Sequence, residues 1–296
     1  MQIITSVQNY KIQQICKLHD AKARAKQQLF LAEGMRTIET LLSQTEFQAD
    51  TNSSNQTNLS NNNSTNSHSS RVSTRLSLTL AQLFITPEIW GNCPDSIKNL
   101  PDNLITLVSQ QVSAKISTTS TPSGILAVFE IPKYPLANLQ NNLSSNLTSN
   151  LSTGIVLVDL NNPGNLGTLI RTAAALNLET VVTIAGTDPW GPKVVQASAG
   201  TIGKVKIYEL SWPELLTAKQ ALKLCALTPD AKLNLLAPEN RLIIKNSLLV
   251  IGNEAHGIPK DYLETCEYQF SLPMPGNTES LNAAIAGAIA MYLTVQ

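Results

Sequence analysis

The sequence has few of the side chains from which disulfide frameworks and zinc centres are built. Its four cysteines are scattered and form no Cys-x-x-Cys pair: Cys16, Cys93, Cys225 and Cys266. In a chain of 296 residues, such a distribution is typical of reduced, buried thiols. Only three histidines occur, so no metal centre is expected.

Long apolar runs are also lacking, although 43% of the residues are hydrophobic, as in ordinary globular proteins. No stretch approaches the roughly 18 uninterrupted apolar residues that a membrane span needs. The first ten residues do not have the basic and then apolar segments of a secretory signal. We therefore expect a cytoplasmic protein, long enough for two domains with separate cores.

Net charge is the third absence, since 21 Lys and Arg balance 21 Asp and Glu. A balance of zero argues mildly against a nucleic-acid-binding protein, because phosphate contacts usually need clustered cations. However, residues 1–36 hold six Lys and Arg but only Asp20 and Glu33 as acids. Within this stretch, Lys22, Arg24 and Lys26 form either a solvated face or a nucleic-acid-binding surface.

Residues 1–132 have the pattern of a small α/β domain. Residues 4–45 have apolar faces typical of helices, interrupted by a predicted strand at 30–34. Further strands are predicted at 81–85, 104–108 and 124–129. Residues 50–75 are mostly Asn, Ser and Thr, and they predict a disordered insertion because they bury too little apolar surface. Residues 133–153 are interpreted as a linker.

Residues 154–296 have the pattern of a second, larger α/β domain. The apolar run that ends at Asp159 is typical of a strand covered on both faces. Further strands are predicted at 180–184, 205–208, 222–226, 247–252 and 268–272. Helices are predicted at 166–176, 192–199, 212–220 and 279–293. This alternation predicts a parallel sheet with helices on both faces.

Three segments mix Gly or Pro with polar side chains, and each follows an apolar run: NPGNLGTLIR (162–171), IGNEAHGIP (251–259) and LPMPGNTESLN (272–282). A ligand site at the carboxyl ends of parallel strands requires this combination. In the first segment, Asn165 opens a helix and can cap its free N–H groups, and Arg171 follows in the second turn. The alternative is an ordinary turn whose Arg171 pairs with a surface carboxylate.

In the second segment, Gly252 allows a ligand to approach the backbone closely. Glu254 is either a hydrogen-bond acceptor that stabilises the turn or a residue of the site. His256 could serve as a base, although a single histidine in a loop is usually only solvated. The residues of this segment leave both interpretations of Glu254 open.

In the third segment, Pro273 and Pro275 cannot donate to a sheet, so the chain leaves the sheet there. The backbone groups released in this way suit recognition of an adenine edge. Ser280 and Asn282 either belong to the site or merely cap the alanine-rich helix that follows.

Together and in this order, the three segments closely resemble the motifs of the SpoU–TrmH family of RNA ribose 2′-O-methyltransferases. The resemblance extends to DPW (188–190) and ASAG (197–200), and it covers essentially all of residues 154–296. A weaker resemblance, through KARAK (22–26) and FLAEG (30–34), links the first domain to the family's substrate-binding domain, which resembles a small ribosomal RNA-binding protein. The family implies a parallel-sheet SPOUT domain with a deep trefoil knot and a homodimer in which two chains shape each active site.

The resemblance implies S-adenosylmethionine as the methyl donor. The residues that it assigns to donor binding are Gly252, Leu272, Leu281, Leu227, Thr228, Met274, Asn253 and Gly257. It assigns catalysis to Arg171, and because a guanidinium stays protonated in proteins, we expect Arg171 to hold a substrate phosphate or stabilise the developing alkoxide. Asn165 and Asn282 would position the hydroxyl, Glu254 would set the geometry of the loop and of Arg171, and Ser280 would help to organise the third turn.

The expected partner is RNA with exposed loops, ribosomal RNA first and transfer RNA second. Lys22, Arg24, Lys26 and Arg36 are predicted to bind it. Two other classes of function compete with this one. A non-catalytic RNA-binding or ribosome-assembly protein would have damaged motifs, and here they are intact. A nucleotide-dependent oxidoreductase would carry a Gly-x-Gly-x-x-Gly fingerprint, which the first segment lacks.

Overall fold

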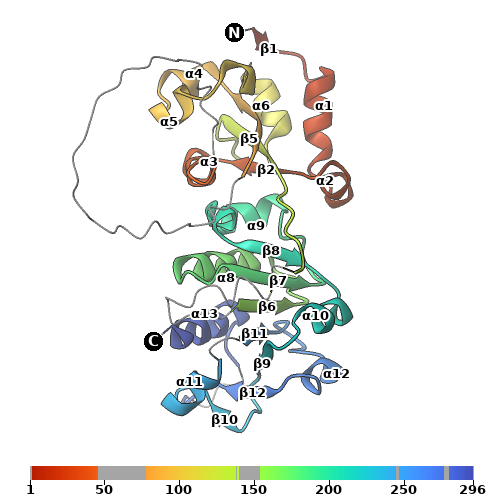
Figure 1. Cartoon of the computed structure of the whole chain (residues 1–296). Helices are drawn as coiled ribbons and strands as arrows, with labels where there is room; N and C mark the ends of the chain where they lie inside the picture. The colour runs from red at the N-terminus through yellow and green to blue at the C-terminus, as the bar shows by residue number, and fades with distance from the viewer. Residues whose placement is uncertain are drawn as a thin grey trace, which may run out of the picture.

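The structure is a computed structural model that describes residues 2–45, 78–137, 139, 154–244, 247–276 and 280–295. These residues form two β-sheets with helices on both faces. The N-terminal sheet lies at one end of the molecule and the C-terminal sheet at the other, with α9 (Pro192–Ala197) between them (Figure 1). The insertion expected at 50–75 lies outside the described residues.

The N-terminal domain is built on a mixed five-stranded sheet with the strand order β1-β4-β3-β5-β2. Its strands are β1 (Ile3–Ile4), β2 (Leu29–Glu33), β3 (Leu80–Ile85), β4 (Ile105–Val108) and β5 (Ile125–Glu130). β5 runs antiparallel to both of its neighbours, whereas β1, β4 and β3 are parallel. Strands therefore form where the sequence predicts them, and the short edge strand β1 is added.

Side chains alternate between the two faces of this sheet, as the period of a strand requires. Leu31 packs on the side of α1 and α6, whereas Phe30 and Ala32 pack on the side of α3 and α5. The helical elements are α1 (Tyr10–Lys17), α2 (Ala21–Gln27), α3 (Met35–Leu42), α4 (Pro87–Gly91), α5 (Asp95–Lys98), η1 (Asp102–Leu104) and α6 (Gln110–Ile116). The domain is thus closed by helices on both faces.

The C-terminal domain is built on a seven-stranded parallel sheet with the order β10-β12-β9-β11-β6-β7-β8. Its strands are β6 (Gly154–Val158), β7 (Thr180–Ile184), β8 (Lys206–Glu209), β9 (Lys223–Leu227), β10 (Leu233–Asn234), β11 (Ser247–Ile251) and β12 (Tyr268–Ser271). All residues of β6 and β11 are buried, which explains why these strands are continuous apolar runs. The predicted α/β class with a parallel sheet is confirmed.

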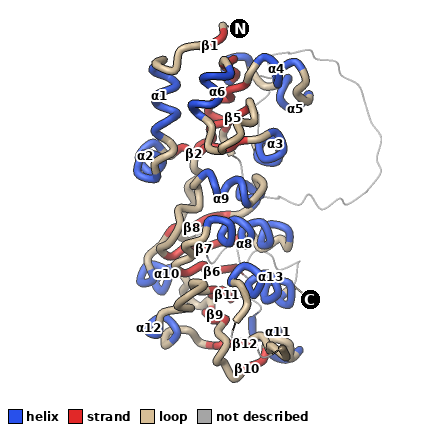
Figure 2. Tube along the Cα trace, turned by 180° about the vertical axis from the view of Figure 1, so that it is seen from behind, coloured by secondary structure: helices blue, strands red, loops and turns tan. Residues whose placement is uncertain are grey.

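Helices cover both faces of the parallel sheet (Figure 2). α8, α9, α11 and α13 pack on one face, and α10 and α12 pack on the other. Their bounds are α8 (Pro163–Ala175), α10 (Trp212–Ala218), α11 (Pro238–Ile244), α12 (Lys260–Leu263) and α13 (Ala283–Thr294). Among the described residues, no helix is long and apolar enough to cross a bilayer.

One apolar cluster extends through both domains. It contains Phe30 and Leu41 from the first domain together with Trp190 and Ile202 from the second. α9 contacts β2, and η2 (Thr201–Lys204) contacts α3. The two domains therefore meet through packed side chains as well as through the connecting chain.

The expected domain boundary and the linker at 133–153 stay predictions, because residues 138 and 140–153 lie outside the described residues. Within the described part of that stretch, Leu139 is fully buried against the C-terminal sheet. The trefoil knot also stays a prediction. It concerns the threading of the loops around β11 and β12, and residues 277–279 of the last loop are not described.

Candidate active site

The carboxyl ends of β9, β11 and β12 surround a cavity of about 480 Å³. All eight residues predicted to hold the methyl donor line it: Leu227, Thr228, Gly252, Asn253, Gly257, Leu272, Met274 and Leu281. They meet because parallel strands that are neighbours in a sheet end at the same edge. A volume of this size suits a small-molecule ligand.

The loop after β11 is a compact turn that requires glycine at its first position. A Cβ atom on Gly252 would lie 2.4 Å from the carbonyl carbon of Gly257. Asn253 and Gly257 exchange two backbone hydrogen bonds of 3.0 Å, and the backbone N–H of His256 donates to Asn253 Oδ1 at 3.1 Å. Asn253 Nδ2 donates to the Asp159 carbonyl at 2.7 Å, which fixes this loop to the end of β6.

A chain of hydrogen bonds between side chains links all three segments. Asn165 Nδ2 donates to Glu254 Oε1 at 2.6 Å, and Asn282 Nδ2 donates to Asn165 Oδ1 at 3.3 Å. Asn282 Oδ1 accepts from the backbone N–H groups of Ala284 and Ile285, at 2.9 and 3.3 Å, so it also caps α13. Each amide therefore has the one orientation that satisfies both of its neighbours.

Asn162 caps α8, so the prediction that Asn165 does so is wrong. Asn162 Oδ1 accepts from the backbone N–H groups of Gly164 and Asn165, at 2.8 and 3.4 Å. The helix begins at Pro163, earlier than predicted, because proline is well suited to the first helical position. Asn165 therefore stands inside the first turn, where its side chain contacts Glu254.

Ser280 lines the cavity, and it is exposed. Asn282 lies two residues further on and outside the lining, and the capping that the sequence offered as one alternative is present, while its place in the site stays a prediction. It caps α13 and it contacts Asn165 in the first segment. Glu254 likewise both lines the cavity and accepts a hydrogen bond.

Arg171 lies outside the cavity and on another side of α8 from Asn165. Six residues along an α-helix correspond to about 240° of net rotation. Its exposed side chain lines a groove of about 440 Å³ together with Tyr292 of α13. Among the residues that the structure describes, no hydrogen bond or ion pair of Arg171 occurs. Glu254 contacts Asn165 and not Arg171, contrary to the expectation that it orients the arginine.

Sequence reasoning missed Asp230 and Ile258 in the lining of the cavity. Asp230 stands two residues after Thr228, so extending the predicted loop would have found it. The lining combines apolar side chains with the carboxylates of Asp230 and Glu254. S-adenosylmethionine fits this combination, because it has a flat apolar adenine ring and carries positive charges on sulfur and on its amino group.

Three of the four residues predicted to bind RNA are exposed: Lys22, Lys26 and Arg36. Arg24 is buried and forms an ion pair with Asp188 of the C-terminal domain, which contradicts the prediction that Arg24 contacts RNA. The physical reason is the period of a helix. Positions 22 and 26 share one face of α2, and position 24 lies on the opposite face.

Comparison with protein families identifies both domains. Residues 152–292 match the SpoU rRNA Methylase family, and residues 9–79 match the MRM3-like substrate binding domain. Residues 152–292 therefore form a SpoU rRNA methylase domain, and residues 9–79 match a substrate-binding domain of the MRM3-like type. The resemblance inferred from the three segments is confirmed.

Two relatives are similar over almost their whole length. An uncharacterized tRNA/rRNA methyltransferase of Synechocystis is 29% identical, over 98% of this chain and 92% of its own. The 23S rRNA (guanosine(2553)-2′-O)-methyltransferase RlmP of Bacillus subtilis is 25% identical, over 99% of this chain and 98% of its own. Both domains therefore take part in the similarity.

Solved structures show the same fold. An AdoMet-bound rRNA methyltransferase from Sinorhizobium meliloti superposes with a TM-score of 0.73 at 21% identity, over 99% of this chain and 97% of that one. The SpoU methyltransferase AviRb from Streptomyces viridochromogenes, in complex with AdoMet, superposes with a TM-score of 0.73 at 19% identity, over 97% of both chains. The arrangement of both domains thus recurs in these proteins.

Proposed function

We propose that the protein transfers a methyl group from S-adenosylmethionine to a ribose 2′-hydroxyl of structured RNA, with ribosomal RNA as the first substrate to test and transfer RNA as the second. The observation that carries the proposal is the hydrogen-bond chain from Glu254 through Asn165 to Asn282 beside the donor cavity. Relatives named as 23S rRNA 2′-O-methyltransferases support the choice of ribosomal RNA. A cytoplasmic location is part of the proposal.

The cavity would hold the donor through the loops that follow β9, β11 and β12. When bound, S-adenosylmethionine would supply a methyl group on a positively charged sulfur: the bond from the methyl carbon to the ribose oxygen would form as the C–S bond breaks, the neutral thioether would leave, and the hydroxyl proton would pass to solvent. Gly252 would allow close approach of the donor to the backbone. The carboxylates of Asp230 and Glu254 would face its positive charges.

The amides of Asn165 and Asn282 would position the ribose hydroxyl. Because each amide is oriented by its neighbours, little freedom has to be lost when the substrate binds. Ser280 is exposed at the same cavity and would help to organise this side of it. Alignment of the hydroxyl with the methyl group is therefore the main task of these side chains.

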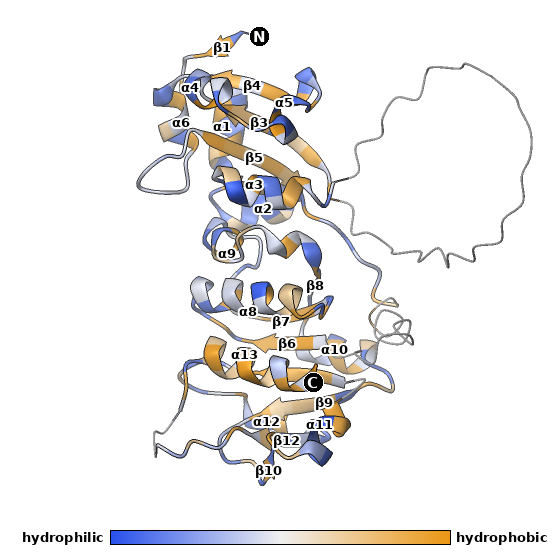
Figure 3. Ribbon diagram, turned by 90° about the vertical axis from the view of Figure 1, so that its left-hand side faces the viewer, coloured by the Kyte–Doolittle hydropathy of each residue, from blue (hydrophilic) through white to orange (hydrophobic). Residues whose placement is uncertain are grey.

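Arg171 would act from a partner subunit in a homodimer. Its groove is also lined by Tyr292, which forms an exposed apolar stripe on α13 with Ile285 and Ile289, and the exposed Leu281 stands just before the helix. Figure 3 shows α13 as one of the more hydrophobic helices of the molecule. A second copy packed on this stripe would cover the apolar surface and bring an arginine near the donor cavity. There the guanidinium would hold a phosphate or stabilise the developing alkoxide.

Incubation with labelled S-adenosylmethionine and total RNA tests the reaction. We expect label in RNA, at alkali-resistant positions that mark 2′-O-methylation. Donor binding without RNA labelling would favour a non-catalytic RNA-binding protein. Mapping of 2′-O-methyl positions in RNA from cells with and without the protein identifies the nucleotide.

The substitution Arg171→Ala tests the role of the arginine. We expect it to reduce transfer by at least about 10²-fold, as for loss of a group that stabilises developing charge, while donor binding survives. Arg171→Lys keeps the charge but not the bidentate geometry, so it should recover only part of the activity. Loss of donor binding in a calorimetric titration of Arg171→Ala would refute the assignment.

A further inference from the structure

The DPW (188–190) and ASAG (197–200) segments match the family, yet neither lines the donor cavity. Both lie where the C-terminal domain meets the N-terminal domain. Asp188 contacts Arg24 of α2, Trp190 contacts Phe30 of β2, and Gly200 lies against Thr37 of α3. We call these contacts, from α2, β2 and α3 on one side and residues 188–200 on the other, the domain joint.

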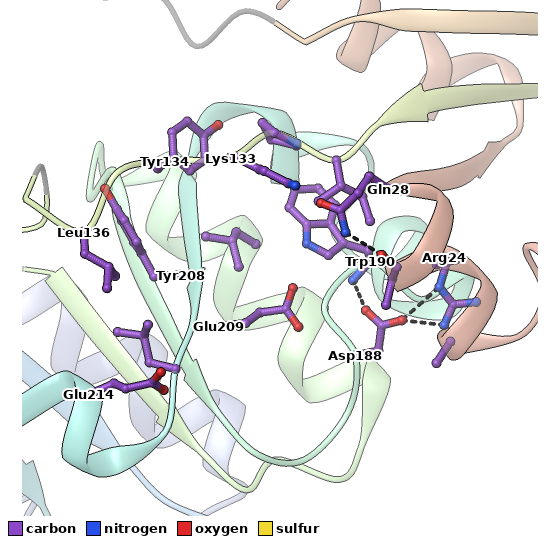
Figure 4. A pocket seen from close by; sticks show the side chains of 16 residues that line it. Arg24, Gln28, Lys133, Tyr134, Leu136, Asp188, Trp190, Tyr208, Glu209 and Glu214 are labelled. Carbon is purple, nitrogen blue, oxygen red and sulfur yellow. Dashed lines mark hydrogen bonds and ion pairs between the residues drawn. The ribbon is translucent and has the colours of Figure 1, made fainter.

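Arg24 is the polar centre of the joint, as Figure 4 shows. Its Nε and Nη2 both donate to Asp188 Oδ2, at 2.8 and 2.5 Å. Its Nη1 donates to the carbonyl oxygens of Leu18 and His19, at 2.8 and 3.0 Å. Only 6% of the Arg24 side chain is exposed. A guanidinium can satisfy these directions at once because its donors form a rigid planar fork, whereas an ammonium cannot.

Asp188 is held in turn by its own domain, because its Oδ1 accepts from the backbone N–H of Trp190 at 2.8 Å. One carboxylate oxygen thus faces the C-terminal domain and the other faces Arg24. The pair is partly buried, since the Asp188 side chain is 25% exposed, and it contributes little net stability because desolvation offsets much of the attraction. Its geometry is nevertheless strict, so it is well suited to fix an orientation.

Apolar packing completes the joint. The centroids of the Trp190 and Phe30 rings lie 5.0 Å apart, and the Phe30 ring stacks on that of Phe129 with 5.6 Å between centroids. The backbones approach closely at Gly200, where a Cβ atom would lie 2.4 Å from the Thr37 carbonyl oxygen. A rotation of one domain against the other would therefore break several contacts together.

Beside the joint, the domains separate around a cavity of about 590 Å³ lined by both of them, with Gln28 on one side and Glu209 on the other (Figure 4). The domains are not packed together across this space. On this side of the molecule, the ion pair and the aromatic contact must therefore carry the alignment.

We infer that Arg24 is a positioning residue: through Asp188 it holds the substrate-binding domain at one angle to the donor cavity and thereby sets which nucleotide of the bound RNA is methylated. This inference rests on the proposed function. The exposed Lys22 and Lys26, on the opposite face of the same helix, would contact RNA. One short helix would thus connect RNA contact directly to domain alignment.

The test uses Asp188→Asn, which keeps the size of the side chain but removes its charge, and Arg24→Lys, which keeps the charge but removes the fork. We expect unchanged donor affinity by calorimetry, RNA affinity within about twofold of the wild type, and a kcat on RNA lower by about 10²-fold, as for a displaced substrate. Mapping of the products should show methylation at additional neighbouring nucleotides. Small-angle X-ray scattering should show a wider spread of domain orientations.

Lys219→Gln is the matched control, because it removes an ion pair with Glu267 that lies within the C-terminal domain. It should leave the methylated position and kcat unchanged. If Asp188→Asn and Arg24→Lys, measured per donor-binding molecule, modify the same nucleotide at the wild-type rate, the inference is overturned even if their thermal stability falls. If the wild-type protein binds RNA and the donor but transfers no methyl group, the proposed function fails and the inference falls with it.

Discussion

At the scale of single residues, position on a helix decides what a charged side chain does. Lys22 and Lys26 are exposed, whereas Arg24 between them is buried against Asp188. The same geometry separates Asn165 from Arg171 on α8, so the amide contacts Glu254 of the donor cavity and the arginine shares a groove with Tyr292 of α13. The type of a residue determines which interactions its side chain can make, and its position along the helix determines on which face the side chain lies.

Gly252 offers a sharp test at this scale. In Gly252→Ala, the new Cβ atom would lie 2.4 Å from backbone atoms of Gly257, which cannot move aside as a flexible side chain would. We expect donor affinity to fall by at least about tenfold and stability to fall by about 1–3 kcal/mol, as for overpacking. Calorimetric titration and urea unfolding measure the two effects.

Gly91→Ala is the control for that substitution, because a Cβ atom added at Gly91 would have nothing within 4 Å. It should leave donor affinity unchanged. An unchanged donor affinity in Gly252→Ala would contradict the prediction, because the loop could then accept a Cβ atom without loss of the donor site.

Glu33 is a buried carboxylate that holds the 117–123 loop of the N-terminal domain. Its oxygens accept from Ser117 Oγ (2.8 Å), from the Thr118 backbone N–H (2.7 Å) and hydroxyl (2.8 Å), and from the Ser123 backbone N–H (3.2 Å). Burial by itself would raise the pKa of Glu33, but these hydrogen bonds lower it below its usual range. The charged form therefore stabilises the folded domain.

For Glu33→Gln we expect a loss of roughly 1.5–3 kcal/mol at pH 7, the typical contribution of a hydrogen bond to a charged group. Because the folded pKa is lowered, the contribution is complete above the unfolded pKa and is lost as the pH falls through the folded value. The difference between wild type and variant in urea unfolding should thus shrink below about pH 4. Glu130→Gln, at an exposed position, should show neither effect. A difference that persists at low pH would contradict the assignment to the ionised carboxylate.

At the scale of elements, the strands were the predictable part. Continuous apolar runs predicted β6, β7 and β11 to within one residue at each end, because a strand buried on both faces leaves no other pattern. The short helices α5 and α11 were missed, since four to seven residues give too little periodicity to recognise. The predicted start of α8 is too late, because Asn162 and not Asn165 caps the helix.

The exposed apolar stripe of α13 leads to a prediction about the oligomeric state. Ile285→Lys places a charge in this stripe, where Ile285 is 51% exposed. If a second copy covers this stripe, we expect the variant to be monomeric and to lose methyl transfer, with donor affinity retained or weakened. Analytical ultracentrifugation over a range of concentrations measures the change. Leu242→Lys, at another exposed apolar position on α11, should not alter the oligomeric state. A wild-type protein that is monomeric at all concentrations would reject the dimer.

At the scale of the whole molecule, the even balance of charge conceals an uneven distribution. The first 36 residues carry six cations against two acids, although Arg24 among them is paired with Asp188, while the chain as a whole is neutral. The three motif segments predicted one shared site because all follow parallel strands. The docking of the two domains could not be predicted, since it depends on pairs such as Arg24 and Asp188 that are 164 residues apart in the sequence.

The few exposed cations predicted to contact RNA imply that RNA binding depends only modestly on salt concentration. Few phosphate contacts are available, so log K should fall with log salt with a small slope, and Lys22→Gln combined with Lys26→Gln should reduce that slope by about 2. Fluorescence anisotropy with a labelled RNA hairpin at several salt concentrations measures it. Lys98→Gln, at an exposed site on α5, is the control. An unchanged slope in the double variant would place the RNA elsewhere.

The shared apolar cluster has a consequence for synthesis on the ribosome. Phe30 and Leu41 emerge early, but their partners Trp190 and Ile202 follow more than 140 residues later. At ordinary elongation rates, these apolar side chains of the nascent first domain therefore stay without their partners for roughly 10 s or longer. During that interval the growing polypeptide is a natural client for chaperones, and mutations that weaken the cluster would relieve this dependence at the expense of the finished enzyme.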